Sequence, residues 1–232
     1  MIDPLSLTRI DRIVMADGAV LWRVVCEPAT GGRGGRRRGD GRMTGGRMTA
    51  RLTLVLGGAR SGKSALAERL TRAAAAGGPL VYVATAQAFD DEMRERIARH
   101  VADRGPDWTT IEAPDDPAAA ITAAAGMAAG GAVLIDCLTI WAATLMHLNR
   151  DPDKETARLV EAARDAGRPV VMVSNEVGLG IVPDNALARR FRDVAGRMNQ
   201  QVAAAADRVV FVAAGLPLVM KGAALGAEEV AS

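Results

Sequence analysis

The chain has few aromatic residues and hardly any cysteine or histidine. Phe, Trp and Tyr make up 3% of its 232 residues, so aliphatic side chains must supply most of the core. Its two cysteines, Cys26 and Cys137, form neither a zinc-ligand spacing nor a disulfide framework. No apolar run reaches the roughly 18–20 residues that cross a bilayer, and the N-terminus lacks a signal-peptide layout. We therefore expect a soluble, cytoplasmic protein with no membrane span.

Charge is unevenly distributed along the chain. Residues 1–50 carry nine Arg against five acidic residues, whereas the remainder carries 20 basic and 22 acidic residues. The body of the protein therefore offers no electrostatic case for binding nucleic acid.

The first 48 residues differ in composition from the rest. Residues 30–47 are rich in Gly and Arg, a composition typical of disorder. The segment Ile10–Val25 has a weak pattern that fits a hairpin around Asp17-Gly18. We expect residues 1–48 to be a disordered leader, or to precede a start codon at Met43 or Met48. The alternative is an arm that binds RNA or phosphate.

From Arg51 onward, short apolar runs alternate with helical patterns. The expected strands are Leu52–Leu56, Leu80–Ala84, Ala132–Asp136, Pro169–Ser174 and Val209–Ala213. The expected helices are Lys63–Ala75, Asp91–Asp103, Pro117–Ala129, Leu138–Leu148, Lys154–Asp165 and Ala186–Ala205, the last with an apolar stripe at Leu187, Phe191, Val194, Met198 and Val202. The alternation predicts a doubly wound α/β domain over residues 49–232, with a mostly parallel sheet and helices on both faces.

A glycine-rich loop directly follows the first expected strand of that domain. It reads Gly57, Gly58, Ala59, Arg60, Ser61, Gly62, Lys63, Ser64 and fits the pattern G-x-x-x-x-G-K-[ST]. In a P-loop of this kind the backbone N–H groups and the helix N-terminus surround a phosphate chain. Lys63 is the residue expected to reach the β- and γ-phosphates, and the Ser64 hydroxyl is expected to ligate Mg²⁺. The sequence thus predicts a P-loop NTPase-like fold that binds a nucleoside triphosphate.

Two further strand ends carry acidic residues. Asp136 ends an apolar strand, where a Walker B carboxylate would hold Mg²⁺; capping of the next helix is the alternative. Glu176 follows another strand and opens a glycine-punctuated loop, so it is a candidate general base for a hydroxyl. Ligands of such sheets bind beyond the carboxyl ends of the strands, where both residues fall.

Six segments together resemble one family. They are GGARSGKS (57–64), VYVATAQ (81–87), DDEMRERIARH (90–100), WTTIEAP (108–114), LIDCLT (134–139) and the long run from Ser174 to Asp207. In this order they are similar to the bifunctional adenosylcobinamide kinase and adenosylcobinamide-phosphate guanylyltransferase family of cobalamin biosynthesis. The resemblance covers residues 51 to about 221, and the N-terminal 48 residues have no counterpart in it.

The resemblance implies two reactions. ATP or GTP would phosphorylate adenosylcobinamide, and GTP would then deliver GMP to that phosphate through a guanylylated histidine, which aligns with His100. It also implies a homo-oligomer, a trimer in relatives, and nucleotide contacts at Thr85, Ala86, Gln87, Val101, Ala102, Asp103, Arg104, Glu112 and Asp136.

Two other functions compete with this interpretation. One is a P-loop small-molecule kinase without guanylyltransferase activity, in which His100 would be inert. The other is a nucleotide-dependent nucleic-acid-binding ATPase that uses the Arg/Gly arm, which the charge distribution disfavours.

Overall fold

The computed structural model describes residues 7–14, 20–26, 50–86, 104–127 and 130–230. Contacts between Cα atoms divide the chain into two compact units, Met1–Arg47 and Met48–Ser232. In the first unit, β1 (Leu7–Val14) pairs antiparallel with β2 (Val20–Cys26), as a hairpin requires, while the predicted turn at Asp17-Gly18 lies outside the described residues. Residues 30–47, expected to be disordered, lie outside the described ranges.

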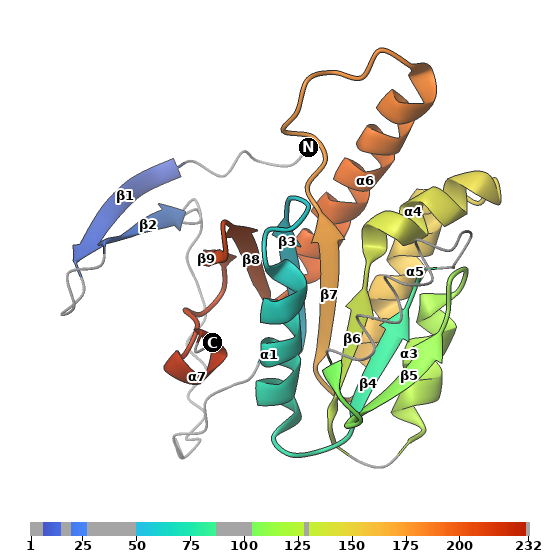
Figure 1. The fold of residues 1–232 in the computed structure, drawn as a ribbon, viewed down its shortest axis with the longest axis horizontal. Coiled ribbons are helices and arrows are strands. Elements are labelled where there is room, and N and C mark those ends of the chain that lie inside the picture. Colours follow the sequence, from blue (N-terminus) through green and yellow to red (C-terminus); the bar gives the residue numbers. More distant parts are fainter. Residues whose placement is uncertain (1–6, 15–19, 27–49, 87–103, 128–129, 231–232) are drawn as a thin grey trace, which may run out of the picture. The chain divides into compact units, whose positions relative to one another are not determined.

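The second unit is built on one seven-stranded sheet (Figure 1). Its spatial order is β5-β4-β6-β7-β3-β8-β9, and the pairs are parallel except for the antiparallel β8–β9 edge. The strands are β3 (Leu52–Gly57), β4 (Leu80–Ala84), β5 (Trp108–Glu112), β6 (Ala132–Asp136), β7 (Val170–Asn175), β8 (Arg208–Ala213) and β9 (Leu216–Lys221). The predicted α/β fold with a mostly parallel sheet is confirmed.

Helices cover both faces of this sheet (Figure 1). They are α1 (Lys63–Ala75), α3 (Pro117–Ala125), α4 (Leu138–His147), α5 (Pro152–Asp165), α6 (Ala186–Ala205) and α7 (Ala227–Val230). Helix α1 packs on one face and contacts α7, while α3, α4, α5 and α6 pack on the other. No helix in the described parts of the chain has both the length and the apolar character needed to span a membrane.

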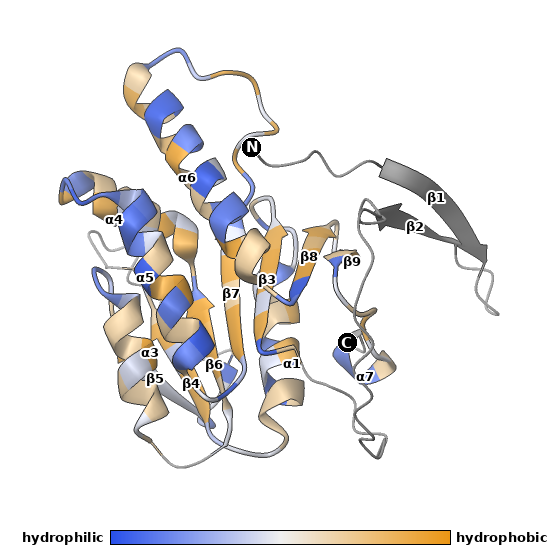
Figure 2. Cartoon of the chain, turned by 180° about the vertical axis from the view of Figure 1, so that it is seen from behind, coloured by the Kyte–Doolittle hydropathy of each residue, from blue (hydrophilic) through white to orange (hydrophobic). Residues whose placement is uncertain are grey.

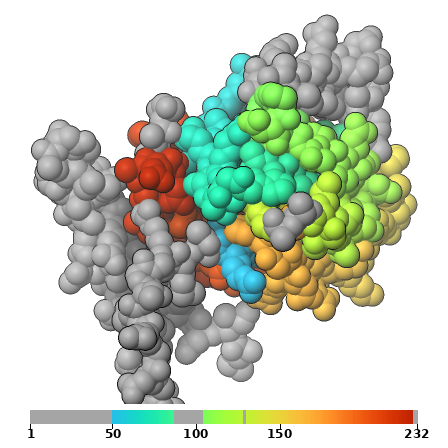
Figure 3. Space-filling model, turned by 90° about the horizontal axis from the view of Figure 1, so that it is seen from below, coloured from blue at the N-terminus to red at the C-terminus, as the bar shows by residue number. Residues whose placement is uncertain are grey.

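Each face of the sheet has its own apolar layer. On the α1 face the layer includes Leu66 and Leu70 of the helix with Val55 and Leu134 of the strands. Figure 2 shows the opposite side, where the strands are coloured mostly hydrophobic and hydrophilic residues alternate with hydrophobic ones along α5 and α6. Seen from below in Figure 3, α1 lies between the C-terminal segment that contains α7 and the segment around α3.

Strands β5 and β9 were not predicted as strands. Both are outer strands of the sheet. Strand β5 carries the polar residues Thr109, Thr110 and Glu112 and so has no continuous apolar run, whereas β9 is apolar from Leu216 to Met220 but includes Pro217, which weakens a strand pattern. The helix predicted over Asp91–Asp103 lies outside the described residues. Two predicted helix boundaries were wrong by two residues or more, since α3 ends at Ala125 and α5 begins at Pro152, and several others differ by one residue.

The predicted stripe of α6 was wrong at its first position. Val194, Met198 and Val202 are buried, but Leu187 is 70% exposed. A helix of 20 residues is about 30 Å long, whereas a six-residue strand covers about 20 Å. The first turns of α6 therefore extend beyond the sheet, as Figure 1 shows.

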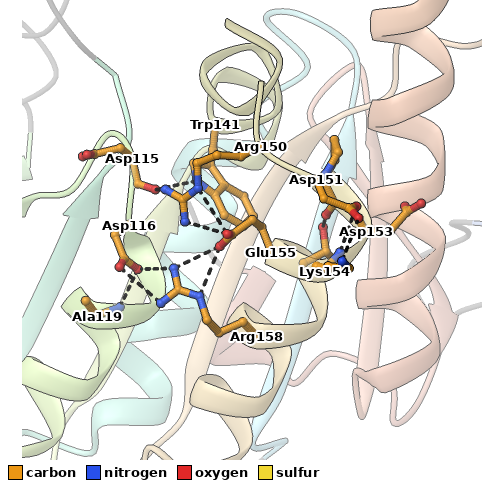
Figure 4. Close-up of polar contacts among 12 residues, drawn as sticks. Asp115, Asp116, Ala119, Trp141, Arg150, Asp151, Asp153, Lys154, Glu155 and Arg158 are labelled. Carbon is orange, nitrogen blue, oxygen red and sulfur yellow. Dashed lines mark hydrogen bonds and ion pairs between the residues drawn. The ribbon is translucent and has the colours of Figure 1, made fainter. Parts of the chain in front are cut away.

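A cluster of ion pairs joins the beginnings of α3 and α5 (Figure 4). Asp116 caps α3 by accepting a hydrogen bond from the Ala119 N–H, and Arg158 binds Asp116 at 2.7 Å and Glu155 at 3.0 Å. Arg150 completes the cluster with a 2.7 Å contact to Glu155. Partial burial acts to raise the pKa of both carboxyls, but hydrogen bonds from Arg158 to Asp116, and from Arg150 and Arg158 to Glu155, outweigh it and lower both pKa values.

Replacing Arg158 with Met should make stability less dependent on pH. A carboxyl with a lowered pKa stabilises the fold above its unfolded pKa, and that stabilisation is lost as the pH falls through the folded value. Arg158 is 43% exposed, so solvent screening limits the expected loss to about 1 kcal/mol at pH 7, shrinking toward zero below about pH 3. Urea unfolding of the wild type and the variant at pH 7 and at about pH 3 measures the loss in the free energy of unfolding. An equal loss at the two pH values would contradict the prediction.

Candidate functional site

The P-loop predicted from the sequence joins β3 to α1. Gly57 ends the strand, and Gly62 precedes the helix in a left-handed conformation (φ 93°) that favours glycine. The Ser61 N–H donates to the Gly58 carbonyl at 3.3 Å, and Lys63 Nζ donates to the same oxygen at 3.2 Å. The loop therefore turns tightly at the N-terminus of α1, where backbone N–H groups and the helix dipole favour a phosphate.

The turn between β8 and β9 supports this loop from the side. The Gly215 N–H donates to the Ser61 carbonyl at 2.9 Å. A Cβ atom at Gly62 would lie 3.3 Å from the Gly215 Cα, so the two glycines allow close backbone contact. A Cβ atom at Gly57 would lie 2.5 Å from both the Ser61 Oγ and the Val212 carbonyl oxygen. The path of the loop thus depends on the absence of side chains at these positions.

Parallel pairing brings the other candidate residues to the same edge of the sheet. Gly57 is in register with Asn175, and Ala84 is in register with both Asp136 and Glu112. Paired residues in parallel strands project to the same face, which places Asp136 and Glu112 on the α1 side. The structure thus gathers the P-loop and the ends of β4, β5, β6 and β7 along one edge.

A line of hydrogen bonds joins these strand ends. The Thr85 hydroxyl donates to the Cys137 carbonyl and accepts from the Cys137 N–H, both at 2.8 Å. The Thr139 Oγ1 accepts from the Asn175 N–H at 2.6 Å, and the Glu176 N–H donates to the Gly57 carbonyl at 3.1 Å. These bonds connect the residue after β4 to the residue after β6, the first turn of α4 to the end of β7, and the residue after β7 to the P-loop.

Charges of opposite sign act on the thiol of Cys137. Burial raises the pKa of Cys137 to about 11, the Asp136 carboxylate adds to the rise, and the Ile140 N–H and the Lys63 ammonium oppose it. Burial likewise raises the pKa of Tyr82, again with a contribution from Asp136. The charges of Asp136 and Lys63 therefore shift the pKa of Cys137 in opposite directions.

The oxygen ligands available at this edge fit Mg²⁺ bound with a nucleotide. The described residues contain no group of three or more His, Cys, Asp or Glu side chains that could hold a metal ion by themselves. Magnesium in nucleotide enzymes is usually bound by one or two protein oxygens, with phosphates and water completing an octahedron. A Ser64 hydroxyl and an Asp136 carboxylate match that requirement.

Other predicted site residues have varied surroundings. Glu112 is exposed at the end of β5, and the Glu176 Oε1 accepts from the Gly178 N–H at 2.5 Å within its own loop. Arg104 is 5% exposed; its guanidinium stacks 3.3 Å from the centroid of the Tyr82 ring, and its carbonyl accepts from Arg72 at 2.9 Å. Gln87, His100, Val101, Ala102 and Asp103 lie outside the described residues.

Three residues at this edge were missed in the sequence. Thr139 bonds the tip of β7, the Asn199 Nδ2 donates to the Asn175 carbonyl at 3.1 Å, and Gly215 supports the P-loop. Asn199 had a detectable signal, because it is a polar residue beside the apolar stripe of α6. Thr139 and Gly215 had no signal in the sequence. The role of Thr139 depends on the order of the strands, and that of Gly215 depends on a turn between strands at the edge of the sheet.

Comparison with protein families matches residues 53–220 to the family described as cobinamide kinase / cobinamide phosphate guanyltransferase. The chain belongs to this family. Membership confirms the resemblance that the sequence motifs indicated, and the two activities in the family's description are those expected from it.

Characterised relatives within the family cover most of the described chain. The bifunctional adenosylcobalamin biosynthesis protein CobP from Pseudomonas aeruginosa is 48% identical over 172 residues, which are 73% of this chain and 96% of that protein. The corresponding CobU proteins are 40% identical in Salmonella typhimurium and 39% identical in Escherichia coli, each over 73% of this chain and 99% of the relative.

A solved structure with weaker similarity is the flagellar accessory protein FlaH from Methanocaldococcus jannaschii. It has a TM-score of 0.43 and 14% identity, covering 77% of this chain and 81% of that one. Similarity at this level has no bearing on function.

Replacing Gly57 with Ala should disturb the P-loop of this family member. The new methyl group would meet Ser61 Oγ and the Val212 carbonyl at 2.5 Å, so the loop must shift. We expect a loss of stability of about 1–3 kcal/mol and nucleotide binding weakened at least about tenfold. Thermal unfolding and titration with a fluorescent ATP analogue measure both. Gly196→Ala, whose Cβ atom meets nothing within 4 Å, is the matched control; wild-type binding by Gly57→Ala would contradict the assignment.

Proposed function

We propose that one nucleotide site serves both reactions of this cobinamide kinase and cobinamide phosphate guanylyltransferase. The substrates would be adenosylcobinamide with ATP or GTP in the first reaction, and adenosylcobinamide phosphate with GTP in the second. The main support is the P-loop at 57–64, which follows β3 beside the end of β7 and one strand away from β6, in a chain whose family description names both activities.

In the kinase reaction, the P-loop N–H groups and Lys63 would hold the triphosphate. Glu176 would accept the proton of the aminopropanol hydroxyl as that oxygen bonds to the γ-phosphorus and the nucleoside diphosphate leaves. Ser64 and Asp136 would hold Mg²⁺, which neutralises phosphate charge when it is bound. The support for Glu176 is its backbone bond to Gly57, which ties the base to the P-loop.

In the guanylyltransferase reaction, His100 would act as the nucleophile. A neutral imidazole nitrogen would bond to the α-phosphorus of GTP and expel pyrophosphate; a phosphate oxygen of adenosylcobinamide phosphate would then displace the imidazole and take the GMP. This role rests on the motif at 90–100 and its resemblance to the family.

The remaining nucleotide contacts are proposed from the same motifs. Glu112 would read the guanine edge, since a carboxylate can accept from both the N1–H and the N2 amino group. The Thr85 hydroxyl bonds both main-chain groups of Cys137, and the Thr85 N–H donates to the Asp136 carbonyl at 3.3 Å, so a nucleotide contact at Thr85 would come from its main-chain carbonyl. The other contacts proposed are Ala86, Gln87, Val101, Ala102, Asp103 and Arg104.

A cytoplasmic homo-oligomer, with the trimer of relatives as the expected form, is part of the proposal. Exposed apolar side chains support it: Leu216 and Met220 on the outer strand β9 are 72% and 61% exposed, and Ile181 in the loop after β7 is 97% exposed. Large apolar side chains gathered on a surface often mark a contact with another molecule.

Incubation with α-labelled GTP and Mg²⁺ tests the guanylyltransferase proposal. We expect the wild-type protein to acquire an acid-labile, alkali-stable label, as a phosphoramidate does, and His100→Ala to acquire none. His147→Ala is the matched control and should label like the wild type, because His147 lies exposed in the last turn of α4.

Two results would contradict parts of this proposal. An unlabelled wild-type protein that still phosphorylates adenosylcobinamide would indicate a kinase without the second activity. A label that survives His100→Ala would keep the reaction but assign it to another residue.

We also propose that residues 49–232 form the catalytic domain and that residues 1–48 are dispensable. A protein that begins at Met48 should fold and retain both activities within about twofold, because the P-loop and all strands of the sheet lie after that residue. Circular dichroism, sedimentation velocity and both activity assays measure this. Loss of folding, assembly or activity would show that the leader contributes.

A further inference from the structure

We infer that Thr139 and Asn199 are positioning residues for the kinase reaction, because they hold the backbone that leads into Glu176. The inference rests on the proposed role of Glu176 as general base. Both side chains are only 6% exposed, Thr139 in the first turn of α4 and Asn199 in the second half of α6.

The tip of β7 needs such support because it extends past its neighbour β6. The pairing of these strands ends with Asp136 opposite Val173, so Ser174 and Asn175 have no β6 residue beside them. On that side the main-chain groups of a strand tip would otherwise lack partners. Helix α4 begins two residues after β6 ends, which puts Thr139 where the missing residues of β6 would lie.

Side chains satisfy both main-chain polar groups of Asn175. The Thr139 Oγ1 accepts from its N–H at 2.6 Å and lies 3.2 Å from the Ser174 Oγ. The Asn199 Nδ2 donates to its carbonyl at 3.1 Å. Two helices thus fix this one residue of the strand tip.

The other side of the tip is bonded to the P-loop. Gly57 is in register with Asn175, and its carbonyl accepts from the Glu176 N–H at 3.1 Å. Glu176 therefore begins its loop from a backbone that is held on one side by Thr139 and Asn199 and on the other by the phosphate-binding loop. A general base works only within hydrogen-bond reach of its proton, and a displacement of about 1 Å can cost about a hundredfold in rate.

The chemistry of Asn199 argues against a role in packing alone. It lies next to the apolar stripe of α6, where Met198 and Val202 are buried, and its Oδ1 is buried with no hydrogen-bond partner among the described residues. An apolar residue at position 199 would avoid the free-energy cost of burying an unpaired polar atom. The asparagine donates a hydrogen bond from its Nδ2 to the Asn175 carbonyl, which a leucine at this position could not do.

The test compares Thr139→Val with Thr139→Ser. Valine keeps the shape but removes the acceptor, whereas serine keeps the hydroxyl. For Thr139→Val we expect kcat of adenosylcobinamide phosphorylation to fall by about tenfold to a hundredfold, with nucleotide KM and self-labelling by α-labelled GTP close to wild type. Thr139→Ser should restore most of kcat. Thr144→Val is the matched control, because Thr144 lies on the same helix and its hydroxyl bonds only its own helix, at the Ile140 carbonyl.

Asn199→Ala provides a second route if Thr139→Val does not fold. It should also lower kcat with little change in nucleotide KM, whereas Gln200→Ala, an exposed neighbour on α6, should not. Wild-type kcat in folded Thr139→Val or folded Asn199→Ala would overturn the inference, as would equal losses of phosphorylation and self-labelling, because those indicate general destabilisation. A wild-type enzyme that self-labels but does not phosphorylate would overturn the proposed kinase chemistry, and this inference with it.

Discussion

The site depends on one constraint, which is that parallel strands end at a common edge. The carboxyl ends of six parallel strands lie along one edge of the sheet. Residues that are far apart in the sequence, from Gly57 to Glu176, therefore lie along the same edge. Alignment by the sheet alone would leave the ends free to move separately. The hydrogen bonds from Thr85 to Cys137, from Asn175 to Thr139 and from Glu176 to Gly57 join them into one frame.

Much of the fold was predictable because it follows from local patterns. Buried parallel strands such as β3 and β6 are continuous apolar runs, and the P-loop has a fixed spacing of glycines and lysine. Strand β5 escaped prediction because an outer strand does not need to be apolar throughout, and β9 because Pro217 interrupts its pattern, a residue that sheets accept at their edges. The exposure of the first turns of α6 was not predicted, because a periodic pattern shows which face of a helix is apolar but not where the sheet beneath the helix ends.

The candidate site was predictable only in part for a related reason. Asp136 stands directly after an apolar run and Glu176 directly after a strand, so the sequence predicts that both lie at the edge where the strands end. Thr139 and Asn199 reach the same edge through strand order and through the different lengths of β6 and β7. Strand order and relative strand length depend on the whole fold, so they cannot be predicted from the residues around Thr139 or Asn199. The role of His100 was predicted from the family resemblance, because helical periodicity does not distinguish it from an ordinary histidine in a helix.

The buried thiol of Cys137 has a consequence for the chemical durability of the site. Its pKa of about 11 leaves only about one molecule in ten thousand as thiolate at neutral pH. Oxidants and electrophiles react with the thiolate, and this sulfur is also shielded from solvent. Burial therefore gives the cysteine next to Asp136 a low reactivity, so we expect oxidants and electrophiles to modify this residue slowly.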